Sequence, residues 1–144
     1  MSKRQTMLPI LLVFVLGCSE KDKTNQDEGV QSVTIRNMIK AVNEKGADKY
    51  VEQFSDNVQV YVELVLKING KEALTVNWAN HFQNHPDVRS EIQHLVEIDN
   101  KVIMHDKVWL RQSDIEGSDI VEIFTFQNGK VVRVDVIQPK HLFK

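Results

Sequence analysis

The segment VEIFTFQNGKVVRVDVIQP (residues 121–139) carries the clearest structural signal in the chain. Two runs of β-branched and aromatic residues flank Asn128-Gly129, and both central residues of a type I′ turn need a positive φ, which Asn and Gly adopt readily. We therefore predict a hairpin of strands 119–127 and 130–137. Alternation along the second strand predicts two faces, with Val132, Val134 and Val136 on one and Val131, Arg133, Asp135 and Ile137 on the other.

Upstream of this hairpin, apolar periodicity changes between the helical and the strand pattern. The expected helices are one from Val30 that ends at Gly46, one at 48–54 and one at 71–84; the other expected strands are 58–66, 88–98 and 101–112. Helices followed by a run of long antiparallel strands indicate an α+β fold. We expect a cone-shaped, curved antiparallel sheet packed on three helices, with an open mouth.

The N-terminus has the layout of a bacterial secretory signal, with Lys3 and Arg4 before an apolar run that ends at Leu16-Gly17-Cys18. This run is too short for a membrane span, which needs about 20 residues. Leu-Gly-Cys resembles a lipobox, the cleavage and lipidation site of bacterial lipoproteins. That resemblance implies removal of residues 1–17, a lipidated Cys18, and a location in the cell envelope, at the outer membrane facing the periplasm in a Gram-negative organism.

Residues 18–29 contain the lipidation site and a polar segment that we expect to be a flexible tether, because it has no apolar residue to bury after Cys18. The domain then occupies 30–144. The whole chain has 18 basic and 20 acidic residues, and loss of Lys3 and Arg4 leaves 16 against 20. This acidic balance argues against a nucleic-acid partner. With Cys18 as the single cysteine, no intramolecular disulfide is possible.

Three segments together resemble the nuclear transport factor 2-like superfamily and its SnoaL-like group. They are YVEQFSDNVQVY, GKEAL and the C-terminal VEIFTFQNGKVVRVDVIQP. The resemblance implies a cofactor-free, polyketide-cyclase-like chemistry, in which Asp135 is the acid/base and His105 stabilises an enolate. The chain has Val134 where the group usually has Trp, and one residue fewer between Gly129 and Asp135. A slip of one residue turns a side chain to the other face of a strand.

The residues themselves leave the roles of both candidates open. Asp135 can be a general base with a raised pKa among apolar neighbours, or half of an ion pair with Arg133 on a solvent face. His105 can act as an acid or electrophile, or be a structural or exposed histidine.

Other side chains suggest a pocket more strongly than a metal site. His81 and His85 have the i, i+4 spacing of metal ligands, but no third ligand stands at a suitable spacing, so no metal is expected. The aromatic residues either line a pocket for a flat apolar ligand or fill the core. The candidate pocket residues are Phe54, Tyr61, Trp78, Phe82, Trp109 and Phe124.

Two functions remain open from the sequence. One is a membrane-tethered lipoprotein whose cone binds a small apolar ligand or a partner protein, with a homodimer through the sheet face as a further option. The alternative is a cofactor-free enzyme that transfers a proton next to a carbonyl, as an isomerase or an aldol-type cyclase.

Overall fold

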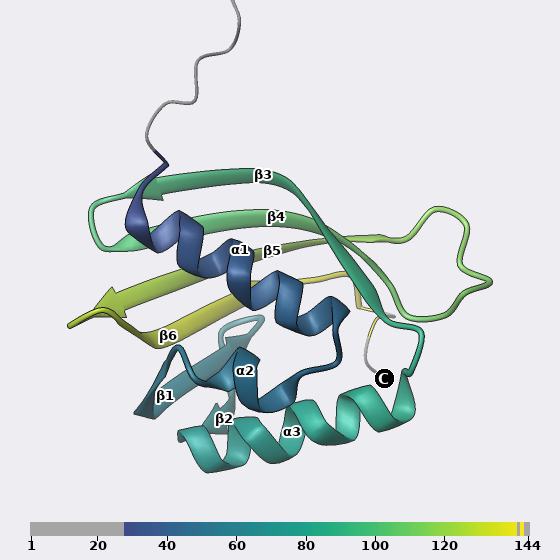
Figure 1. Cartoon of the computed structure of the whole chain (residues 1–144), viewed down its shortest axis with the longest axis horizontal. Helices are drawn as coiled ribbons and strands as arrows, with labels where there is room; N and C mark the ends of the chain where they lie inside the picture. The colour runs from purple at the N-terminus through teal and green to yellow at the C-terminus, as the bar shows by residue number, and fades with distance from the viewer. Residues whose placement is uncertain (1–27, 141, 143–144) are drawn as a thin grey trace, which may run out of the picture.

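One curved sheet and three helices on its concave side form the molecule (Figure 1). The computed structural model describes residues 28–140 and 142. The helices are α1 (Val30–Asn43), α2 (Ala47–Val51) and α3 (Lys71–Asn84). The strands are β1 (Phe54–Val62), β2 (Val65–Asn69), β3 (Arg89–Ile98), β4 (Lys101–Trp109), β5 (Ser118–Gln127) and β6 (Lys130–Ile137). The expected α+β architecture is confirmed.

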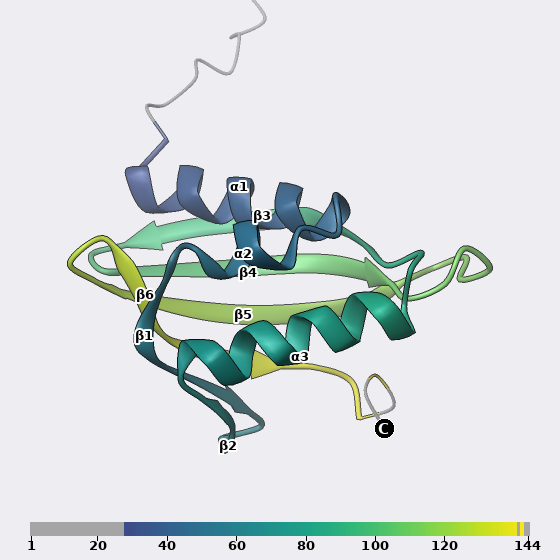
Figure 2. The same ribbon diagram turned by 60° about the horizontal axis from the view of Figure 1, so that its bottom comes forward.

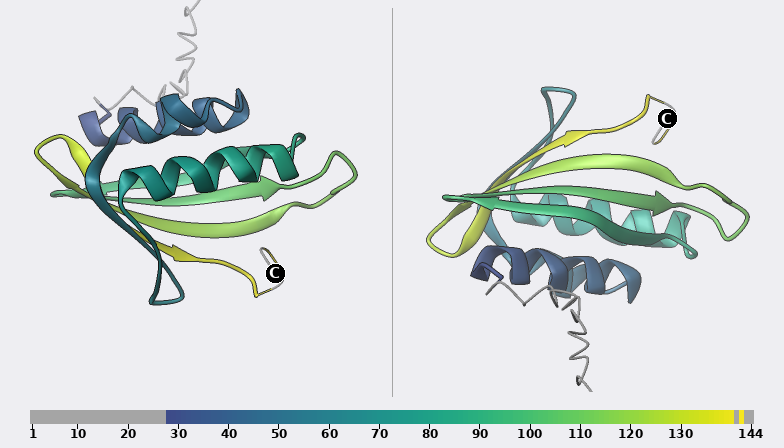
Figure 3. Two further views of the ribbon diagram at one scale, coloured as in Figure 1. Left: turned by 90° about the horizontal axis from the view of Figure 1, so that it is seen from below. Right: turned by 90° about the horizontal axis from the view of Figure 1, so that it is seen from above.

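The strands lie in the order β2-β1-β6-β5-β4-β3, and all neighbours are antiparallel except β1 and β6. The prediction of an entirely antiparallel sheet is therefore wrong for the pair β1 and β6. All three helices lie on the same side of the sheet, as Figures 2 and 3 show. The last strand in the sequence, β6, lies between β5 and β1 and so joins the β1–β2 hairpin to the rest of the sheet.

Helix α1 forms because its apolar residues recur at helical spacing, and the predicted stripe is the buried one. Ile35, Met38, Ile39 and Val42 are all buried. Its N-terminus is fixed by the sheet, because a carboxylate oxygen of Glu97 accepts a hydrogen bond of 2.8 Å from the backbone N–H of Ser32. An anionic group at this helix end also interacts favourably with the helix dipole.

The N-terminal predictions fall almost entirely outside the described residues. The signal peptide, Cys18 and the tether up to residue 27 are not described, whereas Glu28 forms an ion pair with Arg36 of α1. No helix within residues 28–140 has the length and apolar character needed to cross a bilayer.

The predicted single strand 58–66 is wrong, because the chain reverses within it. Glu63 and Leu64 have φ values of 50° and 65°, and they form the turn between β1 and β2. Neither residue type favours positive φ, so the sequence carried no turn signal there. By contrast, Asn128-Gly129 has φ values of 51° and 73° and makes the predicted turn.

Replacing Glu63-Leu64 by Asn-Gly is expected to raise the free energy of unfolding by about 1 kcal/mol, because glycine adopts positive φ without steric cost. Urea unfolding followed by circular dichroism measures this as a higher midpoint at unchanged slope. As a control, Asn-Gly in place of the helical pair Val76-Asn77 should lower the midpoint. An unchanged or lower midpoint for the turn variant would contradict the expectation.

Candidate functional site

A cavity of about 490 Å³ lies between the helices and the concave face of the sheet. Its volume is within the range of small-molecule sites in proteins, about 300–1,000 Å³. Most of its wall is apolar. The apolar lining includes Ile39, Val42, Phe54, Val60, Val62, Ile68, Leu74, Val88, Val108, Ile120, Val134 and Val136. Such a wall favours a mainly apolar guest.

Five titratable side chains interrupt this apolar wall; Lys67 of β2 lies at its exposed side, and the other four come from the helices and from β4 and β5. Tyr50 comes from α2, His81 from α3, Asp106 from β4 and Glu122 from β5. The two acids are there because side chains alternate along a strand: Asp106 shares its face with Val108, and Glu122 shares its face with Ile120. Since Glu122 pairs with Met104 in the register, Asp106 is its diagonal neighbour, about 7 Å away between Cα atoms.

The carboxyl group of Asp106 is nearly inaccessible to solvent and is only half satisfied. Its Oδ2 accepts a hydrogen bond from the hydroxyl of Ser90, which also lines the cavity. Its Oδ1 is buried and has no hydrogen-bond partner among the described residues. Burial raises the pKa of Asp106 to about 6, against the lowering effect of the Ser90 hydrogen bond. An unsatisfied buried oxygen in a cavity wall marks a place where a ligand or a water molecule binds.

Glu122 holds its proton more firmly than Asp106. Burial is the main cause, and the negative charge of Asp106 adds to it, so the pKa of Glu122 rises to about 8. The environments of the two acids thus separate their pKa values. Near pH 7, the dominant state of the pair has Asp106 ionised and Glu122 protonated, which provides one acceptor and one donor.

Tyr50 and His81, which line the same cavity as the two acids, are both neutral near pH 7. Burial, with the charges of Glu122 and Asp106, raises the pKa of Tyr50 well above its ordinary value, so its hydroxyl stays protonated. Burial, with His85 and Lys45, lowers the pKa of His81 to about 4. Both rings contact Trp78, at centroid distances of 4.3 Å from Tyr50 and 5.2 Å from His81. Two neutral polar side chains therefore lie against Trp78 in the cavity wall.

Asp135 does not line the cavity. Its carboxylate accepts two hydrogen bonds from Arg133, at 2.8 Å from Nε and 2.7 Å from Nη2, and this pairing lowers its pKa. The neighbours Val134 and Val136 line the cavity instead. Alternation turns Asp135 to the outer face, so the structure matches the ion-pair alternative and not the prediction of a cavity base.

The predicted faces of β6 were also wrong in part, because the strand contains a bulge. Thr125 pairs with Arg133 and Phe126 pairs with Val131, which leaves Val132 without a partner. Val131 and Val134 are consequently both buried, although the sequence placed them on opposite faces. The extra residue at Val132 interrupts the alternation, so that residues before and after it no longer follow one continuous pattern of faces.

His105 also lies on the outer face, where its Nε2 is 2.9 Å from Oδ1 of Asp119. Its ring stacks on that of His94, with 5.5 Å between the centroids. The next residue in the chain, Asp106, is the one that reaches the cavity. The structure thus does not bring His105 and Asp135 together in the cavity.

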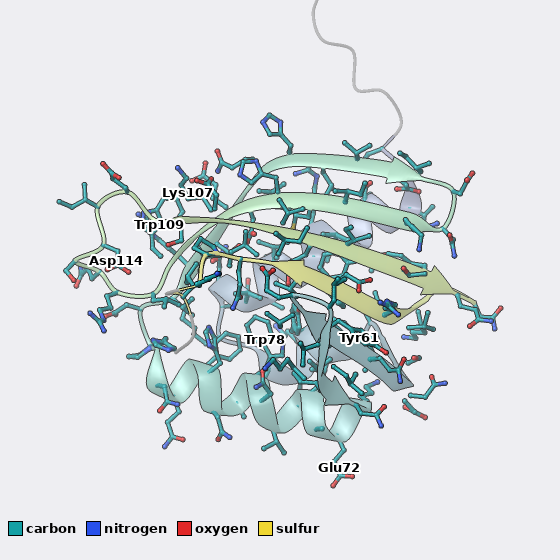
Figure 4. All side chains as sticks on the ribbon, turned by 180° about the vertical axis from the view of Figure 1, so that it is seen from behind. Tyr61, Glu72, Trp78, Lys107, Trp109 and Asp114 are labelled. Atoms are coloured by element: carbon teal, nitrogen blue, oxygen red, sulfur yellow. The ribbon has the colours of Figure 1, made fainter. Side chains whose placement is uncertain are left out.

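The six predicted pocket aromatics divide into three groups. Phe54 and Trp78 line the cavity, and Trp78 projects from α3 toward the sheet in Figure 4. Phe82 and Phe124 are buried in the core without lining the cavity. Tyr61 and Trp109 point to the other face, where Arg133 and Arg89 stack on their rings at 4.0 Å. For these last four residues the pocket prediction is wrong.

His81 of α3 and His85, which follows the end of this helix, have no third ligand among the described residues. The rings of His81 and His85 are 4.9 Å apart between centroids. Across residues 28–140 and 142, no three His, Cys, Asp or Glu side chains are arranged to hold a metal ion.

Comparison with known proteins assigns the domain. The family model described as a SnoaL-like domain matches residues 35–134, which is most of the chain. None of the curated proteins matches. An uncharacterised cystatin-fold protein from Novosphingobium aromaticivorans is 25% identical, with a TM-score of 0.70 over 77% of this chain and 100% of the other.

Two more distant structures have the same fold. A SnoaL-like protein of unknown function from Burkholderia thailandensis is 18% identical, with a TM-score of 0.63 over 73% of this chain and 91% of its own. A candidate polyketide cyclase from Sinorhizobium meliloti is 16% identical, with a TM-score of 0.62 over 72% and 93%. The matched residues 35–134 include both cavity acids and most of the sheet, and the chain therefore belongs to the SnoaL-like domain family, with the nuclear transport factor 2-like fold.

Proposed function

We propose that the cavity binds a small, mainly apolar molecule that carries a carbonyl group, and that Asp106 and Glu122 transfer a proton beside this carbonyl. The observation that carries the proposal is the acid pair, with separated pKa values, in the wall of an apolar cavity. Titratable groups whose environments separate their pKa values are typical of acid–base sites. The candidate polyketide cyclase among the structural neighbours is consistent with chemistry at a carbon next to a carbonyl.

The protonation states assign a role to each acid. Oδ1 of ionised Asp106 has no partner among the described residues, so it is the acceptor for a proton from the carbon next to the carbonyl. The protonated carboxyl of Glu122 donates a hydrogen bond to the carbonyl oxygen, where negative charge develops. Return of the proton to another carbon completes an isomerisation, and attack of the enol on a second carbonyl completes an aldol-type condensation.

Proton transfer can be measured without knowing the natural substrate. In D₂O, the purified domain is expected to accelerate deuterium incorporation next to the carbonyl of decan-2-one, followed by nuclear magnetic resonance. Asp106→Asn should slow this exchange by about a hundredfold, which is within the usual contribution of general base catalysis. Because exchange needs Asp106 ionised and Glu122 protonated, the rate should be highest between about pH 6 and 8 and fall on both sides.

Asp135→Asn is the matched control, because it removes the carboxylate that faces away from the cavity. The control should exchange at the wild-type rate. Equal loss in both variants would contradict the assignment to Asp106. Binding of decan-2-one without accelerated exchange would leave a binding protein and remove the catalytic part of the proposal. Calorimetric titration measures that binding separately.

We also propose that the domain is tethered to a membrane in the cell envelope through a lipid on Cys18, which lies outside the described residues. The support is the signal-like sequence and the lipobox resemblance of residues 16–18. In cells that express the full chain, the protein should sediment with membranes and incorporate an alkyne-labelled fatty acid. Cys18→Ser should abolish labelling, whereas Ser19→Ala should label normally. Labelling of the Cys18 variant would disprove this attachment.

A further inference from the structure

Lys67 is aimed at the cavity by a bulge in the edge strand β2. Val60 of β1 pairs with Ile68 and Tyr61 pairs with Leu66, so Lys67 is the extra residue between them. In a regular strand, consecutive residues point to opposite faces, yet Lys67 and Ile68 both line the cavity. The bulge is what allows this, because an extra residue locally redirects the side chains of its strand.

The ammonium group of Lys67 is unpaired within the part of the chain that the structure describes. It forms no hydrogen bond or ion pair with any of residues 28–140 or 142. The side chain of Lys67 is exposed, although it lines the cavity. Asn77 of α3 is likewise an exposed residue of the cavity lining. The cavity therefore has a cationic group at a solvent-accessible side that pairs with nothing in the described chain.

The two acids lie well away from this cation. Glu122 is on β5 and Lys67 on β2, with β1 and β6 between them. Three strand spacings of about 4.8 Å separate the backbones of these two strands by about 14 Å along the curved sheet. Asp106 is one strand further. The lining residues between the two ends on this face are valines, including Val60, Val134 and Val136.

We infer that the ligand of this cavity is an elongated apolar molecule with a carboxylate at one end, which Lys67 binds, and a carbonyl at the other, which reaches Glu122 and Asp106. This inference rests on the proposed function and adds the chemical class of the ligand. The orientation follows from charge: ionised Asp106 repels a carboxylate from the inner end, and Lys67 attracts it at the mouth. The apolar chain lies along the valines between them.

The test compares two ten-carbon ketones that differ only at the far end of the chain. 9-Oxodecanoate has a carboxylate where decan-2-one has a methyl group. Calorimetric titration of the wild-type domain at low ionic strength should give a dissociation constant about tenfold lower for 9-oxodecanoate. The preference should shrink in high salt, because Lys67 is exposed and its charge is screened.

Lys67→Met should bind both ketones with equal affinity, and Lys67→Arg should restore most of the preference for the acid. Lys40→Met is the control, since Lys40 is exposed on α1 and does not line the cavity; it should behave as wild type. If both ketones bind the wild type equally, or if the preference survives in Lys67→Met, the inference is wrong while the proposed binding stands. If neither ketone binds, the proposed function fails with it.

Discussion

Glu122→Gln is expected to remove most of the loss of stability that the wild-type protein shows as the pH rises from 5 to 9. The pKa of Glu122 is raised to about 8 in the folded state, from an ordinary value of 4.5. The proton on Glu122 therefore stabilises the folded state fully below about pH 4.5, and this contribution is lost as the pH rises through 8. Glutamine is neutral throughout, so the variant keeps the uncharged state.

The size of this effect follows from the shift in pKa. One unit corresponds to about 1.4 kcal/mol. Because Glu122 is half-buried rather than buried, solvent screening makes the effect smaller than the full shift would give. We expect the wild type to lose about 3 kcal/mol more than the variant between pH 5 and pH 9. Urea unfolding at a series of pH values measures the difference. Glu91→Gln, on an exposed position of β3, should follow the wild-type curve. Parallel curves for Glu122→Gln and wild type would show that Glu122 is ionised in the fold.

Phe124→Ala is expected to lower the free energy of unfolding by about 3–5 kcal/mol, the usual cost of removing a buried phenylalanine ring. Phe124 is fully buried, on the concave face of β5, and belongs to the core cluster that includes Phe54, Met38 and Val131. This is a large fraction of the total stability of a domain, which is typically about 5–15 kcal/mol. Thermal and urea unfolding both measure it.

The neighbouring residue provides the control for this prediction. Ile123 points to the outer face of the same strand and is only partly buried. Ile123→Ala should cost about 1 kcal/mol, because the residue loses less buried surface and leaves no enclosed cavity. Equal costs for the two substitutions would mean that the core does not lie on the side of the sheet that the structure shows.

The fold was predictable wherever local chemistry and tertiary structure agreed. Asn128-Gly129 specifies its turn through φ alone, and the apolar stripe of α1 is buried as its spacing predicts. The β1–β2 hairpin was missed because Glu63-Leu64 adopts positive φ without a residue that favours it. There the pairing of the flanking strands determines the turn, and a sequence window does not contain that information.

Alternation could have identified both cavity acids, but the prediction selected His105, one residue before Asp106, and no acid on β5. Val102, Met104 and Val108 mark the inward face of β4, and Asp106 falls on that face. On β5, Ile120, Glu122 and Phe124 likewise share one face. The resemblance drew attention to His105 and Asp135 instead. The bulge at Val132 could not be predicted, because it depends on the register with β5.

The parallel pairing of β1 with β6 has a consequence for the order in which the molecule can fold. Tyr61 lies beside Asp135, so a strand from the beginning of the domain is held by the strand made last. Until residues 130–137 emerge, the β1–β2 hairpin has no place in the sheet, and β5 has an open edge. The closing contact joins distant parts of the chain, which makes folding slow relative to helical domains of similar length. In a nascent chain arrested before Lys130, the β1–β2 hairpin would have no strand through which to pair with the β5-β4-β3 part of the sheet.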